Sequence, residues 1–494
     1  MSSSTLNILF ASSEVFPLIK TGGLADVSSG LPQAISKLGH DIRVILPAYK
    51  QIIDDWQCNE IAQHEVNGYK VRLLSVKLDN NETTIWLVDI PELFYRNGGP
   101  YSAPDGHDWP DNAERFATFS RVVTEISMNR FGLNWQPDVV HCNDWQTGLI
   151  PAFLSLAHER PSTVFTVHNM AYLGLFPHQT FIQLNLPEHW WAWNMLEFHH
   201  HLSFMKGGLI FSDRVNTVSP TYAEQIKTPE YGYGMEGLLN YRSHILSGIL
   251  NGVDYEQWNP ETDPLIPQNY SVSSIDKKKL NKQALQKHFE LPEDDEVMLV
   301  GVVGRMVEQK GYDLILHALP SMTDKAVQIV MLGSGDTQLE SDLLNSMEDH
   351  PEKISVIIGY DEKVSHLVEA GADLFLMPSR FEPCGLNQFY SLKYGTVPLV
   401  SNTGGLADSV VDATPENIEN QTATGFKFNQ INTESFIEAF ERAYSSYQNP
   451  PQWSQIVKTG MKQDFSWESS AQKYVALYHK SIKSQYHIPA NFSV

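Results

Sequence analysis

A hexapeptide, TGGLAD, occurs twice in this chain, at residues 21–26 and again at 403–408. Glycine has no Cβ, so a glycine pair lets backbone amide groups approach an anion closely, and the N-terminus of a following helix adds positive potential. Each copy stands between a strand-like and a helix-like segment. The two copies therefore predict loops of the nucleotide-binding type, one in each half of the chain, that act on one ligand.

Three charged residues in the second half have the chemistry to act on a sugar diphosphate. Arg305 and Lys310 lie in GRMVEQKG, after a strand-like segment, where fixed cations can neutralise a departing diphosphate. Glu382, in the turn EPCGLNQ, could accept hydrogen bonds from sugar hydroxyls or stabilise a positively charged sugar-like transition state. The alternative is structural: the two cations could cap a helix, and Glu382 could cap a helix or pair with Arg380.

The first half offers fewer candidates. Lys20 precedes the first glycine pair and could reach a phosphate, whereas Asp26 is either a site residue or a helix N-cap. His168 ends the segment FTVHN and is the favoured histidine, because Asn169 and a loop follow it. The three histidines at 199–201 are expected to be exposed, since consecutive residues do not face one metal ion. In the second half, Cys384 is expected to be a packing residue.

The elements that must position these residues alternate between strands and helices. This alternation predicts two parallel, doubly wound sheets, in which ligands bind at the carboxyl ends of the strands. In the first half a helix is expected at 28–38, capped by Gly39, and a hairpin is expected at 70–78 and 83–90, with its turn at 79–81. The other strands are expected at 7–13, 41–48, 137–144, 162–169, 214–220, 297–306, 327–335, 354–361, 373–379 and 396–402.

The predicted fold class is α/β, with two Rossmann-like domains. A chain of 494 residues is too long for one core, which favours a division into residues 1–255 and 256–464. A C-terminal helix at 465–485 is expected to pack on the first domain. The loop 93–116 is long and rich in Gly, Pro and Tyr, so it is expected to border a binding cleft.

Composition excludes several classes of protein. The formal net charge of −23 argues against nucleic acid or an anionic membrane as a partner. No apolar run approaches the ~20 residues of a membrane span, and the start lacks the features of a signal peptide. Three cysteines form neither a disulfide framework nor a CxxC pair, so a cytoplasmic protein is expected. The GxGxxG, P-loop and GxSxG motifs are missing, which argues against a dinucleotide oxidoreductase, an NTPase and a hydrolase.

Taken together, the motifs resemble those of the bacterial glycogen synthases and plant starch synthases. The matching segments span nearly the whole chain in family order, from KTGGLADV at 20–27 to DFSW at 464–467. Between them lie FTVHN (165–169), VSPTYA (218–223), YGMEGLL (233–239), LNGVD (250–254), SRFEPCGL (379–386) and LKYGTVPLV (392–400).

The resemblance implies a retaining glucosyltransferase of the GT-B architecture, with its active site in a cleft between the two domains. It implies ADP-glucose as the donor and the non-reducing end of an α-1,4-glucan as the acceptor, with no cofactor and no essential metal. The first domain would lie on the acceptor side and the second on the nucleotide-sugar side. The residues by themselves do not separate ADP-glucose from UDP-glucose.

The resemblance also assigns roles to individual residues. Arg305 and Lys310 would hold the donor diphosphate and stabilise the leaving ADP, and Glu382 would support the oxocarbenium-like transition state. The other implied contacts are Lys20, Gly22, Gly23 and Asp26 near the phosphates or the sugar, His168 and Asn251 at the sugar, Tyr360 beside the adenine, Gly385, Leu386, Thr403, Gly404 and Gly405 through backbone amides, and Tyr95 and Asp144 at the acceptor or the sugar.

Three positions depart from the residues common in this family. Asn143 stands where His is common, Asn387 where Thr is common and Gly304 where Ser is common. Asn143 removes a titratable donor near the sugar site, and Asn387 lies where a phosphate contact is expected. These changes motivate one rival, a catalytically weak glucan-binding or regulatory homologue. The presence of Glu382, Arg305, Lys310 and Lys20 favours an active enzyme.

Overall fold

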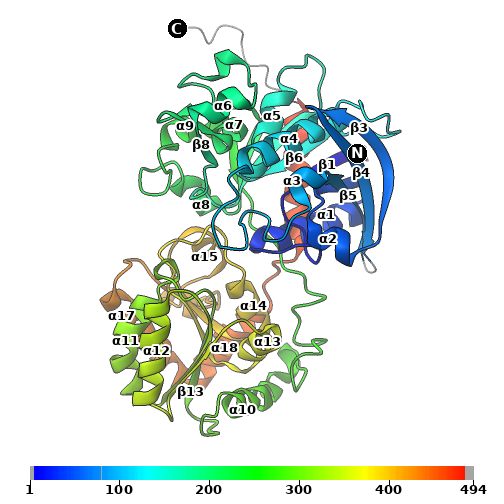
Figure 1. The fold of residues 1–494 in the computed structure, drawn as a ribbon. Coiled ribbons are helices and arrows are strands. Elements are labelled where there is room, and N and C mark those ends of the chain that lie inside the picture. The colour runs from blue at the N-terminus through cyan, green and yellow to red at the C-terminus, as the bar shows by residue number, and fades with distance from the viewer. Residues whose placement is uncertain (1–4, 79–80, 484–494) are drawn as a thin grey trace. The chain divides into compact units, whose positions relative to one another are not determined.

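The computed structural model describes residues 5–78 and 81–483 of the chain (Figure 1). The chain divides into two compact units, which are described separately below. Unit 1 comprises Met1–Gly252 and Trp467–Val494, and unit 2 comprises Val253–Ser466. The sequence placed these two divisions after residues 255 and 464.

The described part of unit 1 contains a nine-stranded sheet with a parallel core. The parallel strands follow the order β5-β2-β1-β6-β7-β11-β12. The order reverses between β1 and β6, and in such sheets ligands bind at the carboxyl ends of the strands beside that switch point. The strands are β1 (Asn7–Ala11), β2 (Asp41–Pro47), β5 (Asn81–Asp89), β6 (Val139–Asn143), β7 (Ser162–Val167), β11 (Arg214–Thr217) and β12 (Leu246–Gly248).

Two antiparallel strands extend this sheet beyond β5. β4 (Tyr69–Leu78) pairs with β5, as the predicted hairpin requires, although residues 79–80 of the predicted turn lie outside the described residues. β3 (Cys58–Val66) was not predicted, because its sequence CNEIAQHEV is largely polar and exposed. A separate small sheet is formed by β8 (Leu175–Pro177), β9 (Glu197–Phe198) and β10 (His201–Ser203).

Helices cover the sheet of unit 1, and the first of them begins earlier than predicted. α1 spans Gly23–Lys37, so the glycine motif itself forms the first helical turn, and the predicted start at residue 28 was wrong. The remaining helices are α2 (Lys50–Asp55), α3 (Pro91–Phe94), α4 (Asn112–Ser127), η1 (Trp145–Thr147), α5 (Leu149–Leu154), α6 (His178–Gln183), η2 (Glu188–Trp190), α7 (Phe204–Phe211), α8 (Pro220–Gln225), α9 (Glu236–Tyr241), η3 (Ser243–Ile245) and α19 (Trp467–Lys483).

α19 packs on unit 1 through buried residues spaced along one helical face. Its first residue, Trp467, fills the space beside Gly30, where an added Cβ would lie 2.0 Å from the indole nitrogen. Further along, Tyr478 Oη lies 2.9 Å from His141 Nδ1, and Tyr474 Oη accepts a hydrogen bond of 3.1 Å from Asn216. The last helix of the chain is thereby tied to β6 and β11.

Acid is expected to weaken the fold through His141. This ring is fully buried between Tyr478 and Thr166, and burial lowers its pKa to about 3. Between about pH 3 and pH 6.5 the unfolded chain binds a proton that the folded protein does not. The free energy of unfolding should therefore fall by about 1.4 kcal/mol for each pH unit of acidification.

The variant His141→Gln removes this titration and leaves every other histidine in place. Urea unfolding at about pH 7 and about pH 5 should show that the wild-type protein loses about 2 kcal/mol more than the variant. An equal pH dependence in the two proteins would mean that folding does not lower the pKa of His141.

The described part of unit 2 forms a six-stranded sheet in the order β15-β14-β13-β16-β17-β18, with every pair parallel. This is the Rossmann order, and its switch point lies between β13 and β16. The five predicted strands are present, whereas the short β18 was not predicted. The bounds are β13 (Met298–Val303), β14 (Val327–Gly333), β15 (Ile354–Ile358), β16 (Leu374–Met377), β17 (Val397–Ser401) and β18 (Phe426–Phe428).

Two apolar clusters lie on the two faces of this sheet, because successive side chains of a strand point to opposite sides. Met298 and Val300 of β13 belong to one cluster and Leu299 to the other. Figure 1 shows α11, α12 and α17 on one side and α10 and α13 on the other. The helices are η4 (Val272–Lys277), α10 (Lys278–His288), η5 (Glu308–Lys310), α11 (Tyr312–Thr323), α12 (Thr337–Asp349), α13 (Glu362–Gly371), α14 (Asn387–Tyr394), α15 (Gly404–Ser409), α16 (Pro415–Glu419), α17 (Thr433–Tyr447) and α18 (Pro450–Met461).

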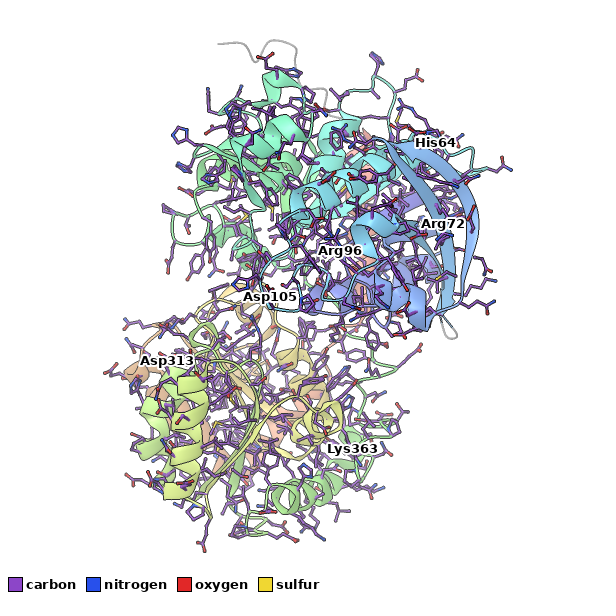
Figure 2. The ribbon with its side chains drawn as sticks, viewed as in Figure 1. His64, Arg72, Arg96, Asp105, Asp313 and Lys363 are labelled. Atoms are coloured by element: carbon purple, nitrogen blue, oxygen red, sulfur yellow. The ribbon has the colours of Figure 1, made fainter. Side chains whose placement is uncertain are left out.

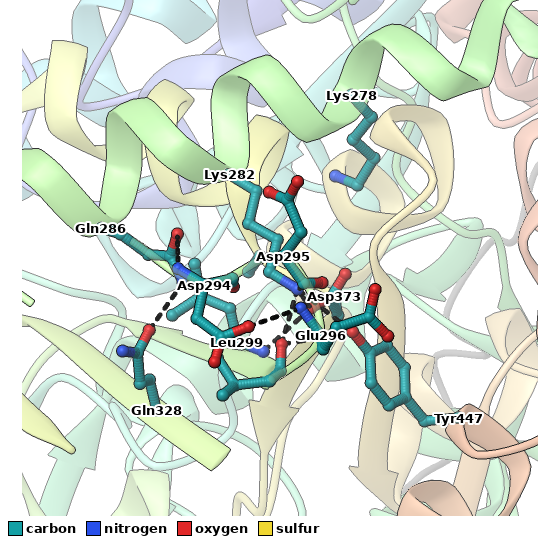
Figure 3. A network of polar contacts seen from close by, with 12 residues as sticks. Lys278, Lys282, Gln286, Asp294, Asp295, Glu296, Leu299, Gln328, Asp373 and Tyr447 are labelled. Atoms are coloured by element: carbon teal, nitrogen blue, oxygen red, sulfur yellow. Dashed lines mark hydrogen bonds and ion pairs between the residues drawn. The ribbon is translucent and has the colours of Figure 1, made fainter. Parts of the chain in front are cut away.

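A charged network ties α10 to the amino-terminal edge of the same sheet (Figure 3). Lys282 is almost fully buried and lies 2.8 Å from Asp373, which also accepts the backbone amide hydrogen of Leu299. Lys282 donates to the carbonyl oxygens of Asp295 and Val297 as well. Because this edge is opposite the strand ends that bind ligands, the network is structural.

Candidate active site

The switch point of unit 2 brings two of the predicted catalytic residues into contact. Lys310 follows β13 and Glu382 follows β16, and Lys310 Nζ lies 2.5 Å from Glu382 Oε2. The two segments can approach because Gly311 has a positive φ and no Cβ, which would lie 2.1 Å from the carbonyl oxygen of Pro378. Parallel neighbouring strands thus place a cation and a carboxylate together at the sheet's carboxyl edge.

The Glu382 side chain is 9% exposed and also accepts a hydrogen bond of 3.2 Å from Ser379 Oγ. The structural alternative raised for it, a pair with Arg380, does not occur in the structure. Arg380 instead contacts Asp313 of α11, labelled in Figure 2, at 2.5 Å, and Glu308 at 3.4 Å. The Glu382 carboxylate therefore pairs with Lys310 and not with Arg380.

Arg305 lies on the exposed side of the same site, and Gln309 connects it to the Glu382 turn. Arg305 Nη2 donates to Gln309 Oε1 at 3.3 Å, and Gln309 Nε2 donates to the carbonyl oxygen of Phe381 at 3.4 Å. The backbone amide of Arg380 donates in turn to the carbonyl oxygen of Gln309 at 2.8 Å. The sequence interpretation did not include Gln309, whose polar side chain within GRMVEQKG was the only available signal.

The second glycine motif packs directly behind Glu382. Its Gly405 amide donates to the carbonyl oxygens of Glu382 at 3.2 Å and Pro383 at 3.1 Å, and the Thr403 amide donates to Ser401. Added Cβ atoms would lie 1.9 Å from the Glu382 carbonyl oxygen at Gly404 and 2.2 Å from that of Cys384 at Gly405. The Gly405 amide therefore holds the Glu382 turn, whereas the Thr403 amide bonds at the end of its own strand, β17. A contact of these amides with a ligand stays a prediction.

The end of the Glu382 turn leads into α14. Gly385 has a φ of +73°, and Leu386 stands immediately before the helix, where first-turn amides carry positive potential. Asn387 does not face a ligand with its side-chain amide, which donates to the carbonyl oxygen of Val303 at 2.9 Å. This bond fastens α14 to the end of β13, and Cys384 is buried as expected of a packing residue. Tyr360, after β15, is 76% exposed.

In unit 1 two backbone amides of the first glycine motif bind a carboxylate of the same chain, that of Glu14. The amides of Thr21 and Gly22 donate to Glu14 Oε2 at 2.5 and 3.0 Å, and Tyr101 Oη donates to Oε1 at 2.5 Å. The Gly22 amide is therefore used by Glu14 in this structure, and its contact with a ligand stays a prediction. Glu14 was not predicted, although a carboxylate three residues after the buried strand β1 was a readable signal.

Lys20 and Asp26 pair with one another at 2.8 Å, so Asp26 is not the N-cap of α1, which is Gly22. Both side chains are partly exposed, and such a pair contributes at most about 1 kcal/mol. Lys20 can therefore leave Asp26 for a bound anion at little cost. Gly23 opens α1, and an added Cβ there would meet nothing within 4 Å.

His168 and Asp144 meet beside the switch point of unit 1, at the ends of β7 and β6. The backbone amide of His168, after β7, donates to Asp144 Oδ1 at 2.7 Å, and its ring nitrogen Nε2 lies 2.9 Å from Asn143 Oδ1. Burial lowers the pKa of His168 to about 3 and raises the pKa of Asp144 to about 7. His168 is therefore neutral near neutral pH, whereas Asp144 is close to half ionised.

The two remaining predicted residues lie farther along the sheet of unit 1. Tyr95 follows α3 and donates to Asp54 at 2.9 Å. Asn251 follows β12 and is 7% exposed, and its Oδ1 has no hydrogen-bond donor among the described residues. A buried oxygen without a donor suits a ligand hydroxyl group. The histidines at 199–201 are exposed, as predicted.

Within the described ranges, no group of three or more His, Cys, Asp or Glu side chains is placed to hold a metal ion. The same part of the chain has no helix long and apolar enough to cross a bilayer.

Two Rossmann-like units of this kind are the fold of the GT-B glycosyltransferases, and the comparisons place the chain in that class. Residues 7–241 match the starch synthase catalytic domain, and residues 282–459 match the group 1 glycosyl transferases. The chain belongs to the glycogen synthase family. It is 53% identical to glycogen synthase 1 of Methylococcus capsulatus over 97% of both chains. It is 51% identical to the glycogen synthase of Thioalkalivibrio sulfidiphilus, over 96% of this chain and 99% of that protein.

A solved structure shows the same fold. The catalytic domain of starch synthase IV from Arabidopsis thaliana, bound to ADP and acarbose, superposes with a TM-score of 0.86. The two proteins are 31% identical, and the match covers 97% of this chain and all of that one.

Proposed function

We propose that this glycosyltransferase moves glucose from ADP-glucose to the non-reducing end of an α-1,4-glucan and retains the anomeric configuration. The observation that carries the proposal is the contact of 2.5 Å between Lys310 and Glu382 at the switch point of unit 2. Support also comes from the names of the relatives and from the ADP and acarbose bound to the similar starch synthase. Unit 2 is proposed to bind the donor, and unit 1 the acceptor.

The donor diphosphate is proposed to bind Arg305 and Lys310. In the reaction the bond between glucose C1 and the β-phosphate oxygen breaks, and C1 bonds to the acceptor 4-hydroxyl oxygen on the same face. The departing phosphate keeps the electron pair of the broken bond and takes the proton of the acceptor hydroxyl. Two fixed cations at this point stabilise the negative charge that develops on ADP. In other enzymes that act on phosphate groups, a metal ion has this role. No essential metal is part of the proposal.

Glu382 is proposed to stabilise the positive charge on the transferred glucose rather than to attack it. Its carboxylate is held by Lys310 and Ser379, and electrostatic stabilisation of this kind needs a fixed charge. The exposed ring of Tyr360 suits stacking on the adenine, and Gly385 and Leu386 offer the amides before α14. In unit 1 the proposed sugar contacts are Lys20, His168, Asn251, Tyr95 and Asp144.

The cytoplasm is the proposed location of the enzyme, because its cysteines, among them Cys58 and the buried Cys142, form no disulfide in the structure.

Incubation with ADP-glucose and a maltooligosaccharide tests the proposed activity. Stepwise lengthening of the maltooligosaccharide with release of ADP is expected, and UDP-glucose in competition should be used more slowly. Binding of the glucan without lengthening would favour the rival regulatory homologue. At the two positions that motivated the rival, the side-chain amides of Asn143 and Asn387 donate to the backbone carbonyl oxygens of Ala11 and Val303.

Replacing Lys310 by glutamine should lower kcat/KM for ADP-glucose by about 10²–10³-fold and leave glucan affinity unchanged. The loss arises because one of the two cations proposed to face the diphosphate is gone. Lys325→Gln is a matched control in the same unit, since Lys325 also pairs with a glutamate and has similar exposure, 23% against 25%. The control should keep nearly full activity. Equal losses of donor use and glucan affinity in Lys310→Gln would contradict a diphosphate contact.

A further inference from the structure

The ring of His168 is held by a residue to which the reaction assigns no role. Asn143 is the last residue of β6, and β6 pairs in parallel with β7, which leads to His168. Asn143 is fully buried, and its side chain bridges two neighbours. Its Nδ2 lies 3.0 Å from the carbonyl oxygen of Ala11 in β1, and its Oδ1 lies 2.9 Å from His168 Nε2.

These two contacts fix which nitrogen of His168 carries the hydrogen. The carbonyl oxygen of Ala11 can only accept, so the amide nitrogen of Asn143 must face it, and the amide oxygen must face His168. That oxygen also only accepts, so His168 Nε2 must donate. A neutral imidazole has a single ring hydrogen, and His168 is neutral, so its Nδ1 carries a lone pair.

The main chain of His168 is also held by a hydrogen bond. Its backbone amide donates to Asp144 Oδ1 at 2.7 Å, so the adjacent residues Asn143 and Asp144 fix the ring and the main chain respectively. No hydrogen bond to His168 Nδ1 occurs within the described part of the chain, and the residue keeps some surface exposed to solvent. The lone pair of Nδ1 is therefore available to a donor that comes from outside the protein.

We propose that Asn143 is a positioning residue that locks His168 as the Nε2–H tautomer, so that Nδ1 accepts a hydrogen bond from a hydroxyl group of the bound sugar. The identity of the sugar rests on the proposed function, whereas the tautomer does not. In the opposite tautomer Nδ1 would carry the hydrogen, so it could donate a hydrogen bond but not accept one from a sugar hydroxyl. Nε2 would then present a lone pair to the lone pairs of Asn143 Oδ1.

Nitrogen NMR of the protein labelled only at histidine reads the tautomer directly. His168→Gln identifies the signals of His168 by their loss. The wild-type protein should show a protonated Nε2 and an unprotonated Nδ1 near neutral pH. A protonated Nδ1, or a rapid exchange between both tautomers, would overturn the proposal. This measurement needs no substrate, so it decides the tautomer even if ADP-glucose proves not to be the donor.

A kinetic cycle then tests whether Asn143 acts through His168. Asn143→Leu keeps the approximate volume and removes the acceptor, and it should lower kcat/KM about tenfold, the usual effect of one lost hydrogen bond. In the background of His168→Ala the same change should cost less than about twofold, because coupled residues are non-additive. Equal losses in both backgrounds would show that Asn143 supports only the fold.

Asn143→Asp is a second variant, which keeps an oxygen toward His168, replaces the donor to Ala11 by a carboxyl oxygen and adds a buried ionisable group. Nitrogen NMR of this variant should show Nε2 still protonated, whereas Asn143→Leu should lose the single tautomer. If Asn143→Leu also kept a protonated Nε2 and an unprotonated Nδ1, the lock would lie elsewhere and the proposal would be wrong.

Discussion

Glu382→Ala is expected to abolish glucose transfer, with a loss of at least about 10³-fold in kcat, while the thermal unfolding transition stays nearly unchanged. The carboxylate is the only acidic group in contact with Lys310 in the described structure, at 2.5 Å. Lys310 remains 25% exposed, so water can solvate it once its partner is gone, and the cost to the fold should be small. Chain-extension kinetics and a thermal melt measure the two effects separately.

Two further variants separate charge from shape at this position. Glu382→Gln keeps the size of the side chain and the contact with Ser379 but removes the negative charge, so it should be nearly as inactive. Glu308→Gln alters a glutamate that pairs with Arg380 nearby and is 76% exposed, and it should remain active. Near-normal turnover by Glu382→Ala would remove Glu382 from its assigned role.

Gly405→Ala and Gly23→Ala place the same change at the same position of the two TGGLAD copies and should give opposite results. At Gly405 the new methyl group would lie 2.2 Å from the carbonyl oxygen of Cys384, so the turn that carries Glu382 must move. Overpacking of this kind costs about 1–3 kcal/mol, and displacement of Glu382 should reduce turnover about 10²-fold. At Gly23, in the first turn of α1, nothing lies within 4 Å of the new group.

Gly23→Ala should therefore leave the protein as stable as before, or up to about 1 kcal/mol more stable, because alanine loses less backbone entropy in a helix. Thermal melts of both variants, with chain-extension assays of Gly405→Ala, provide the comparison. Similar melting temperatures for the two variants would show that the second motif does not support the Glu382 turn in the way described.

These two motifs also show what the sequence could not reveal. Six identical residues predicted identical anion-binding loops, yet the donors of one copy bind the Glu14 carboxylate and those of the other bind carbonyl oxygens near Glu382. The partner of a backbone amide depends on segments distant in sequence. Local sequence does not encode that partner.

Five of the six described strands of unit 2 were predictable for a physical reason. Each is a continuous apolar run, because both faces of a parallel sheet are buried. The same rule missed β3, whose residues are polar and exposed, and β18, which is too short to show a pattern. Since the strands that precede Lys310 and Glu382 were predicted, the meeting of these two residues at one sheet edge could be expected, and the structure confirms it.

The positioning residues were harder to find. The side chains of Asn143 and Gln309 each make two hydrogen bonds, and at least one partner of each is distant in sequence. Nothing in their local sequence separates them from ordinary polar residues. Their contacts depend on the tertiary fold. Asn143 reaches His168 because β6 lies beside β7, and Gln309 reaches Phe381 because the segment after β13 lies beside the segment after β16.

A crystal structure of this protein with ADP bound tests the central claim most directly. The diphosphate should contact Arg305 and Lys310 at the switch point of unit 2, while Glu14 stays bonded to the amides of Thr21 and Gly22. A diphosphate seated instead on those two amides, with Glu14 displaced and Lys310 still bound only to Glu382, would contradict the account.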